Sequence, residues 1–326
     1  MKKHFFFLMI AAIFFSACEK NYDLTGVSTL PSKPVVEGYI ENNLPPYVFL
    51  SNTFSVFGSL NKSSLKNLYI HDATVIVSDG SKVINLKEYG IPFGADTLYV
   101  YTVNGLDFSG YASGQVLFSG LGYVGITSAF NIADIGQTNT TYTLSITLKD
   151  GSKISAQTSI LNPPSIDSLW TVPRNAYVND SLVRVWMRYH DDAATKDFYR
   201  YFTKTNKQQF LSGNVQGLES VFNDQYTNGL TYNWPINRGI DRNDTSSNQF
   251  KHPLYFVKGD TVTIKLCRID QAVYDFWLTA DAAYGNTGNP FASPSNLQSN
   301  VTGALGTWTG YASNHSPNYQ QIIIPK

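Results

Sequence analysis

Charged residues are scarce in this sequence and gather in no basic cluster. Asp, Glu, Lys and Arg make up 15% of its 326 residues, with 24 basic and 24 acidic side chains. Because no stretch concentrates Lys and Arg, the sequence lacks the positive surface that binds nucleic acid. We therefore expect no nucleic-acid partner.

The motifs of several enzyme classes are also missing. The five histidines are His4, His71, His190, His252 and His315, and none lies two or four residues from another, as in zinc sites. There is no Gly-x-Ser-x-Gly nucleophile turn and no phosphate-binding Gly loop with a Lys. A facing pair of glycosidase carboxylates cannot be chosen among 24 acidic residues. We therefore predict a protein that is not an enzyme, with no cofactor and no metal.

Two acidic segments leave alternatives open. Residues 182–189 alternate and predict a strand with Val183, Val185, Met187 and Tyr189 facing inward. His190-Asp191-Asp192 follows this strand and could supply a base and a metal-binding carboxylate, although such a run is more typical of a solvated turn. Residues 241–244 (DRND) offer oxygen ligands in a predicted exposed loop but lack the Asp-x-Asp-x-Asp-Gly spacing of a calcium loop.

The two cysteines have different expected roles. Cys267 lies in an alternating strand pattern (TVTIKLCR, 261–268) and is predicted to be a small packed side chain. Cys18 ends a segment with Lys2 and Lys3 at its start and an unbroken apolar run over 5–15. An eleven-residue helix would be about 16 Å long, too short for a bilayer core of about 30 Å.

Residues 1–17 are therefore predicted to be a lipoprotein signal peptide, with lipid attached at Cys18. An ordinary secretory signal with an accidental cysteine is the alternative. Residues 18–33 are polar and read as a tether. We predict a protein anchored by lipid to the outer membrane, on its surface or periplasmic face.

The remaining sequence is typical of a mainly β protein. Tyr and Phe are abundant, at 21 and 20 residues, and fit half-buried pleated surfaces. Alternating strand patterns surround Asp79-Gly80 and Asp150-Gly151, which are hairpin signals. Residues 34–160 are predicted to form an antiparallel β-sandwich, similar to immunoglobulin or transthyretin domains.

A second β-rich domain is predicted over 165–326, after the Pro163-Pro164 boundary. Within it, residues 254–257 and 261–268 are expected to pair as a hairpin. Apolar residues at spacings of three and four predict one helix near 270–284 that covers a sheet. Asp270 can cap its start and Gly285 can end it.

Aromatic residues among polar loop residues are the candidate contacts for a glycan, a peptide or a protein partner. The candidates are Tyr232, Trp234, Trp308 and Tyr311, with Tyr226 beside the first two. The alternative is that these rings fasten loops to the sheet.

An ordered series of short motifs resembles a known family. The motifs are PVVEGYI at 34–40, DATVIV at 72–77, YTLSI at 142–146, AQT at 156–158, YDFW at 274–277, NPF at 289–291, NVTG at 300–303 and GTWTGY at 306–311. Together they resemble the domain-of-unknown-function 4249 family of Bacteroidota lipoproteins over nearly the whole mature chain. The segment ATVIVSDG at 73–80 also looks like the start of transthyretin-like accessory domains.

The resemblance implies no activity that can be transferred residue by residue. The family's genes often lie beside TonB-dependent outer-membrane receptors, which implies a role in uptake or binding at the surface. We therefore predict an outer-membrane lipoprotein that binds a ligand or partner and assists a TonB-dependent uptake receptor. A structural or adhesive surface protein is the alternative, and a hydrolase is the third hypothesis.

Overall fold

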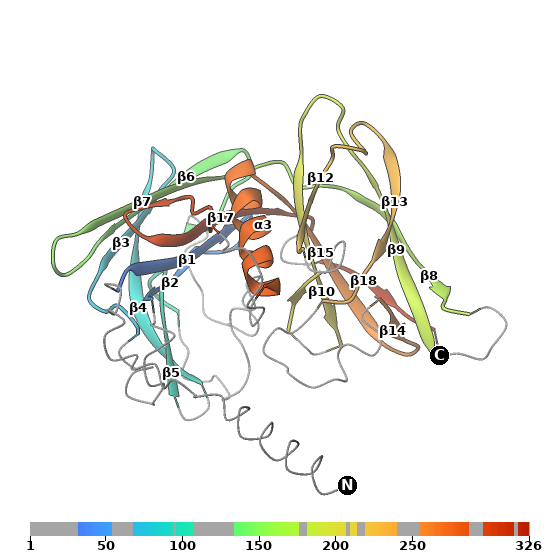
Figure 1. Ribbon diagram of the computed structural model, residues 1–326, viewed down its shortest axis with the longest axis horizontal. Coiled ribbons are helices and arrows are strands. Elements are labelled where there is room, and N and C mark those ends of the chain that lie inside the picture. The colour runs from blue at the N-terminus through green and yellow to red at the C-terminus, as the bar shows by residue number, and fades with distance from the viewer. Residues whose placement is uncertain are drawn as a thin grey trace, which may run out of the picture.

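The computed structural model describes residues 32–53, 68–93, 96–106, 134–175, 181–206, 209–213, 219–239, 254–286, 296–315 and 319–325 (Figure 1). These residues form eighteen β-strands and one helix, α3, so the predicted mainly β fold class is confirmed. Two sheets contain all the strands: a 14-stranded sheet and a 4-stranded sheet.

The larger sheet follows the order β11-β10-β15-β17-β1-β2-β5-β4-β3-β6-β7-β16, with β12 on β10 and β18 on β15. Its strands are β1 (Pro34–Glu41), β2 (Tyr47–Asn52), β3 (Thr74–Ser78), β4 (Val83–Phe93), β5 (Asp96–Thr102), β6 (Thr140–Thr147), β7 (Lys153–Ile160), β10 (Phe198–Thr205), β11 (Leu211–Ser212), β12 (Val221–Asn223), β15 (Thr261–Ile269), β16 (Val301–Thr302), β17 (Leu305–Ser313) and β18 (Gln320–Ile323). The smaller sheet contains β8 (Ile166–Pro173), β9 (Leu182–His190), β13 (Thr231–Ile236) and β14 (Phe256–Val257).

The hairpins predicted from Asp-Gly dipeptides are present. Strands β3 and β4 pair across Asp79-Gly80, and β6 and β7 pair across Asp150-Gly151. Both glycines have positive φ, +91° at Gly80 and +86° at Gly151, the conformation that glycine adopts without a steric penalty. On β6 the side chains alternate between buried and exposed, as expected for a sheet with one face on the core.

Strand β17 brings the end of the chain back beside its beginning. It pairs in parallel with β1, from Val35 opposite Leu305 to Glu41 opposite Tyr311, while β16 pairs with β7. The indole N–H of Trp308 donates a 3.1 Å hydrogen bond to the carbonyl of Tyr142 on β6. The larger sheet therefore curls over one core, and its strand pairing crosses the predicted domain boundary near 160–165.

The smaller sheet covers the β10–β15 end of the larger one. The inward side chains of β9 are Val183, Val185, Met187 and Tyr189, as their alternation predicted, and they share a core with side chains of β10, β12 and β15. The predicted hairpin between 254–257 and 261–268 is wrong, because β14 pairs with β9 in the smaller sheet. A turn at Gly259 carries the chain from one sheet to the other, so the two segments are not neighbours in a ladder.

Helix α3 (Gln271–Gly285) lies within two residues of its predicted bounds and packs on β10, β12 and β17. Asp270 is its N-cap, and its carboxylate accepts a 2.9 Å hydrogen bond from the Val273 amide, which satisfies one of the free N–H groups at the helix start. The same carboxylate accepts bonds from Thr158 and Ser159 on β7. Asp270 therefore fixes the helix to the larger sheet.

Candidate functional site

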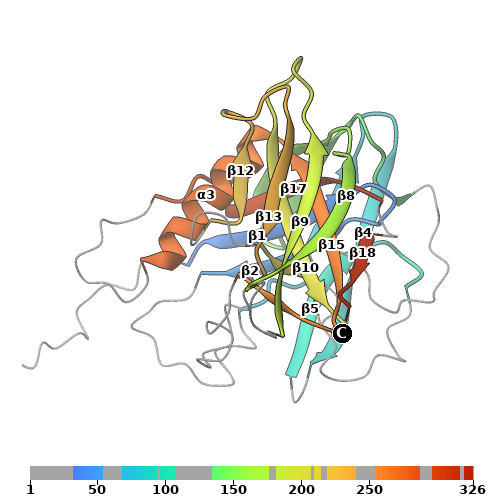
Figure 2. The same ribbon diagram turned by 90° about the vertical axis from the view of Figure 1, so that its right-hand side faces the viewer.

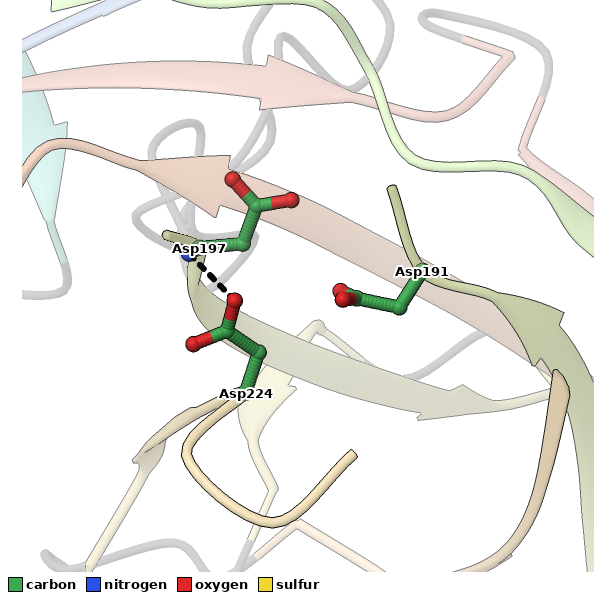
Figure 3. A group of neighbouring side chains, drawn as sticks. All are labelled: Asp191, Asp197 and Asp224. Atoms are coloured by element: carbon green, nitrogen blue, oxygen red, sulfur yellow. Dashed lines mark hydrogen bonds between the residues drawn. The ribbon is translucent and has the colours of Figure 1, made fainter. Parts of the chain in front are cut away.

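Three aspartates from separate parts of the sequence meet at one end of the smaller sheet (Figure 3). Asp191 follows β9, Asp197 precedes β10 and Asp224 follows β12. A carboxylate oxygen from each lies within 4.8 Å of the others. All three side chains are buried, with exposed fractions of 1%, 3% and 2%. Because buried carboxylates need compensating partners, their contacts decide what this group does.

The partners of the three carboxylates are mostly neighbouring protein groups. Asp191 accepts a 2.5 Å hydrogen bond from the Tyr199 hydroxyl and a 3.0 Å bond from the Gly229 amide. Asp197 forms an ion pair with Arg268. Asp224 accepts a 2.9 Å bond from the Asp197 amide (Figure 3).

Burial also changes the acidity of this group. Desolvation raises the pKa of Asp191, while the bonds from Tyr199 and Gly229 oppose that rise. By separation alone the three carboxylates could hold a cation. Since both Asp191 oxygens and the Asp197 carboxylate already have protein partners, we assign the group a structural role: it fixes the loop that follows β12.

That loop, residues 224–230, is a series of hydrogen-bonded turns. The Thr227 amide donates to the Asp224 carbonyl at 2.8 Å, and the Leu230 amide donates to the Thr227 carbonyl at 2.9 Å. The Asp191 amide donates in turn to the Leu230 carbonyl at 3.1 Å. The loop backbone is thereby tied to the end of β9 at two successive residues, Gly229 and Leu230.

Apolar side chains project from this fixed loop and from the start of β13. Tyr226 is 86% exposed, Leu230 52% and Tyr232 38%. We call these three residues the rim patch. A column of rings continues inward from it: Tyr232 lies 5.9 Å from Trp234, and Trp234 stacks on Phe222 at 5.0 Å between ring centroids. The patch therefore rests on the packed core of the smaller sheet.

The structure divides the four candidate aromatic contacts into two pairs. Tyr232 is exposed and Trp234 is partly buried directly behind it. Trp308 and Tyr311, predicted to be exposed near a polar loop, lie on β17 with exposed fractions of 0% and 1%. The expected exposure is wrong for these two, because β17 is an interior strand between β1 and β15. The Tyr311 hydroxyl accepts a 2.7 Å bond from buried Arg200.

Other predicted positions have mixed outcomes. Asp191 is not in a solvated turn, although His190 and Asp192 on either side of it are exposed. Cys267 is buried and free, as predicted, and burial raises the pKa of its thiol to about 12. Cys18, residues 1–17 and residues 241–244 lie outside the described residues. Among the described residues, the structure has no helix that is both long and apolar enough to cross a membrane.

Sequence reasoning missed Asp197, Asp224 and Leu230. Asp197 and Asp224 are isolated acidic residues beside strands, and no local spacing links either of them to Asp191. Their positions relative to the strands could have identified them. Asp197 and Asp224 each lie within one residue of a strand end, where the chain enters or leaves the sheet. Only the pairing of β10 with β12 brings their side chains to the same place.

Comparison with known proteins identifies the family and not an activity. A search of curated proteins finds no match. A family model described as "Domain of unknown function (DUF4249)" matches residues 19–316. Since this match covers most of the sequence, the chain belongs to the DUF4249 family.

Proposed function

We propose that this protein is an outer-membrane lipoprotein that binds a protein partner through the rim patch and assists a TonB-dependent receptor. The observation that carries the proposal is the exposure of Tyr226 and Leu230 on a loop fixed by buried carboxylates, and of Tyr232 on the strand that follows it. Large exposed apolar side chains gathered within a few residues favour a role in binding. Nothing in the proposal requires a reaction, a cofactor or a metal.

The fixed loop suits recognition for an energetic reason. Ordering a flexible loop on association lowers affinity, and a loop that is already ordered avoids that loss. Tyrosine is also enriched among the residues that dominate binding energy, because one ring supplies a large apolar area and a polar end. Tyr226 and Tyr232 have both properties.

The membrane part of the proposal rests on Cys18. Lipid on this residue would hold the domain that begins at Pro34 by a tether, residues 18–33. A chain of that length reaches at most about 50 Å when extended. That reach would let the domain contact a receptor in the same membrane.

The test is recovery of an identified receptor from membranes of the native host. A tagged protein is cross-linked in cells, purified and analysed by mass spectrometry. The rim variant carries Tyr226→Ser, Leu230→Ser and Tyr232→Ser. A matched control carries Val83→Ser, Tyr284→Ser and Ile323→Ser, which are also exposed apolar side chains, at 58%, 47% and 74%.

We expect a TonB-dependent receptor with the native protein and the control, and a loss of at least about tenfold with the rim variant, since dominant contacts each contribute that much or more. Equal recovery with all three proteins would reject the rim patch as the contact. Failure to recover any receptor would reject the accessory role and favour a structural or adhesive protein. Separately, Cys18→Ser should release the protein into the soluble fraction, and a variant that stays in the membrane would reject the lipid anchor.

A further inference from the structure

The outer face of the smaller sheet carries a second aromatic surface, on the opposite face of β13 from Tyr232 of the rim patch. On β9 the even-numbered residues point away from the core, whereas Val183, Val185 and Met187 point into it. The outward residues include Arg184, Trp186 and Arg188. This sheet faces the viewer in Figure 2, with β8 and β13 on either side of β9.

Three apolar residues in direct register form a row across strands β8, β9 and β13. Trp186 on β9 is paired directly with Trp170 on β8 and with Pro235 on β13. The two indole rings are nearly parallel, at 16°, with centroids 6.2 Å apart. All three side chains are partly exposed. Since neighbouring strands lie about 4.8 Å apart, the row is about 10 Å long.

Two arginines stand on either side of this row. Arg184 and Arg188 are four residues apart on one strand, which places their Cα atoms about 13 Å apart. The Arg184 guanidinium donates a 3.1 Å bond to the side-chain oxygen of Asn237, and that of Arg188 donates a 2.9 Å bond to Asn233. Both acceptors are neutral amides, so they orient the guanidinium groups without cancelling their charge.

Within the part of the chain that the structure describes, neither Arg184 nor Arg188 is in an ion pair. The Nε atom of Arg184 is buried and has no hydrogen-bond partner. A ligand on this face does not reach that buried atom, so the attraction for an anion comes from the charge of the guanidinium groups and not from a missing acceptor at Nε.

We propose that this outer platform, composed of Trp170, Trp186, Pro235, Arg184 and Arg188, binds an acidic polysaccharide built of uronic acid units. Sugar rings would lie with their C–H faces on the indole and proline rings. Carboxylates would pair with the two guanidinium groups, whose planar fork matches a carboxylate. Ligand hydroxyls would bond to the exposed polar groups of Ser168, Thr231 and Asn233, which lie on the same face.

The arrangement favours a glycan over an acidic peptide. Side chains that dominate protein–protein contacts usually fill well-packed pockets, whereas this row is an open surface at one level of a sheet. Its surroundings are hydroxyl and amide groups, which complement a ligand rich in hydroxyls. A neutral glycan would leave both guanidinium groups without a counter-charge. This inference is independent of the rim patch and of any receptor.

The test is calorimetric titration of the full mature chain, made with Cys18→Ser, against oligogalacturonate. Methyl-esterified oligogalacturonate has the same backbone without charge, and poly-glutamate has the charge without sugar rings. One variant carries Arg184→Gln and Arg188→Gln, and another carries Trp170→Phe and Trp186→Ala. The matched controls are Lys87→Gln with Lys149→Gln, two exposed cations on other strands or turns, and Tyr284→Ala.

We expect saturable binding of oligogalacturonate that weakens as salt is added. The arginine variant should bind at least about tenfold more weakly, because it removes two charge-assisted contacts, and the esterified ligand should show a similar loss. The tryptophan variant should weaken the binding of both sugars, and the controls should bind like the native chain. Thermal unfolding of each variant tests whether it is folded. If the tryptophan variant is unfolded, the binding of the arginine variant decides the outcome.

Three results would overturn the proposal. The first is no binding of oligogalacturonate by the native chain. The second is binding of poly-glutamate as tight as that of the sugar, which would identify the platform as an acidic-peptide site. The third is an equal loss of affinity in the arginine variant and in the lysine control. That result would mean that the net charge of the protein, and not the platform, determines binding.

Discussion

The amide of Gly229 donates a 3.0 Å hydrogen bond to the Asp191 carboxylate, and this contact joins the loop that carries the rim patch to the end of β9. The same carboxylate accepts the Tyr199 hydroxyl on β10. Asp191 thus connects β9, β10 and the loop after β12 through one buried side chain. The position of the exposed apolar residues depends on a carboxylate that no ligand needs to touch.

Asp191→Ala is expected to destabilise the fold and loosen this loop. The Gly229 amide loses its acceptor, and the Tyr199 hydroxyl loses its shorter hydrogen bond and keeps only the 3.1 Å bond to the Asp197 carboxylate. A donor left without its acceptor costs about 1–3 kcal/mol. Urea unfolding gives the free-energy change, and hydrogen exchange of the 224–230 amides reports the loop. Asp192→Ala is the control, because Asp192 is exposed next to the same strand. Equal effects of both changes would contradict the role given to Asp191.

The raised pKa of Asp191 predicts a pH-dependent contribution to stability. Desolvation raises it above the ordinary value of 3.8, so at intermediate pH the folded state binds more protons at this group than the unfolded state. The contribution of Asp191 to the free energy of unfolding is therefore largest at pH values below its ordinary pKa. It declines as pH rises through the raised pKa of the folded state. Asp191→Asn removes the titration, so the native protein should lose stability relative to this variant between acidic and neutral pH.

Urea unfolding of both proteins at a series of pH values measures that difference. Asp192→Asn makes the same substitution at the neighbouring exposed residue and serves as the comparison. A stability difference between the native protein and Asp191→Asn that does not change with pH would show that burial does not shift the pKa of Asp191.

The thiol of Cys267 is expected to be unreactive in the folded protein. It is fully buried, and desolvation raises its pKa to about 12, so at pH 8 the reactive thiolate is scarcely populated. In a Cys18→Ser chain, Cys267 is the single cysteine. A chromogenic thiol reagent should label it only after urea is added. Prompt labelling without denaturant would contradict the packed position on β15.

Local sequence patterns predicted much of the fold, because they depend on neighbours along the chain. The Asp-Gly turns, the alternation on β6, the inward residues of β9 and the capped helix α3 were all recoverable in this way. A period of two or 3.6 states which face of an element is buried. It does not state which strand lies beside it, and the parallel pairing of β1 with β17 joins residues near opposite ends of the chain.

The same limit explains the errors at the candidate site. Trp308 and Tyr311 follow a polar loop in the sequence and were expected to be exposed, yet β15 and β1 enclose their strand on both sides. The sequence did not single out Asp197 or Asp224, because their partners are distant along the chain. Arg268, for example, is the ion-pair partner that makes the burial of Asp197 tolerable. The exposure of Tyr232, in contrast, was predictable, because its neighbours in the sequence are polar and its side chain is exposed in the folded protein.

The buried ion pair between Lys265 and Glu41 gives a test of the contact between β15 and β1. Lys265→Met alone should destabilise the protein by about 3–5 kcal/mol, because it leaves an uncompensated buried carboxylate. Adding Glu41→Gln should restore much of that loss, since the second charge is then gone. A double-mutant cycle in urea measures the coupling. Additive effects would contradict a direct pair.

Gly306 tests the parallel pairing of β17 with β1, and Gly80 provides a matched control. Both glycines have positive φ, +116° and +91°. A Cβ at Gly306 would lie 1.9 Å from the Val36 carbonyl oxygen on β1, whereas one at Gly80 would meet nothing within 4 Å. Gly80→Ala should therefore cost about 1–2 kcal/mol, the conformational penalty alone.

Gly306→Ala adds to that penalty a clash with backbone that cannot rotate away. We expect it to destabilise the protein by more than about 3 kcal/mol, in the range of severe core changes, or to prevent folding. Urea unfolding of the two variants provides the comparison, and circular dichroism shows whether Gly306→Ala folds at all. Equal stability of Gly306→Ala and Gly80→Ala would mean that β17 does not lie against β1.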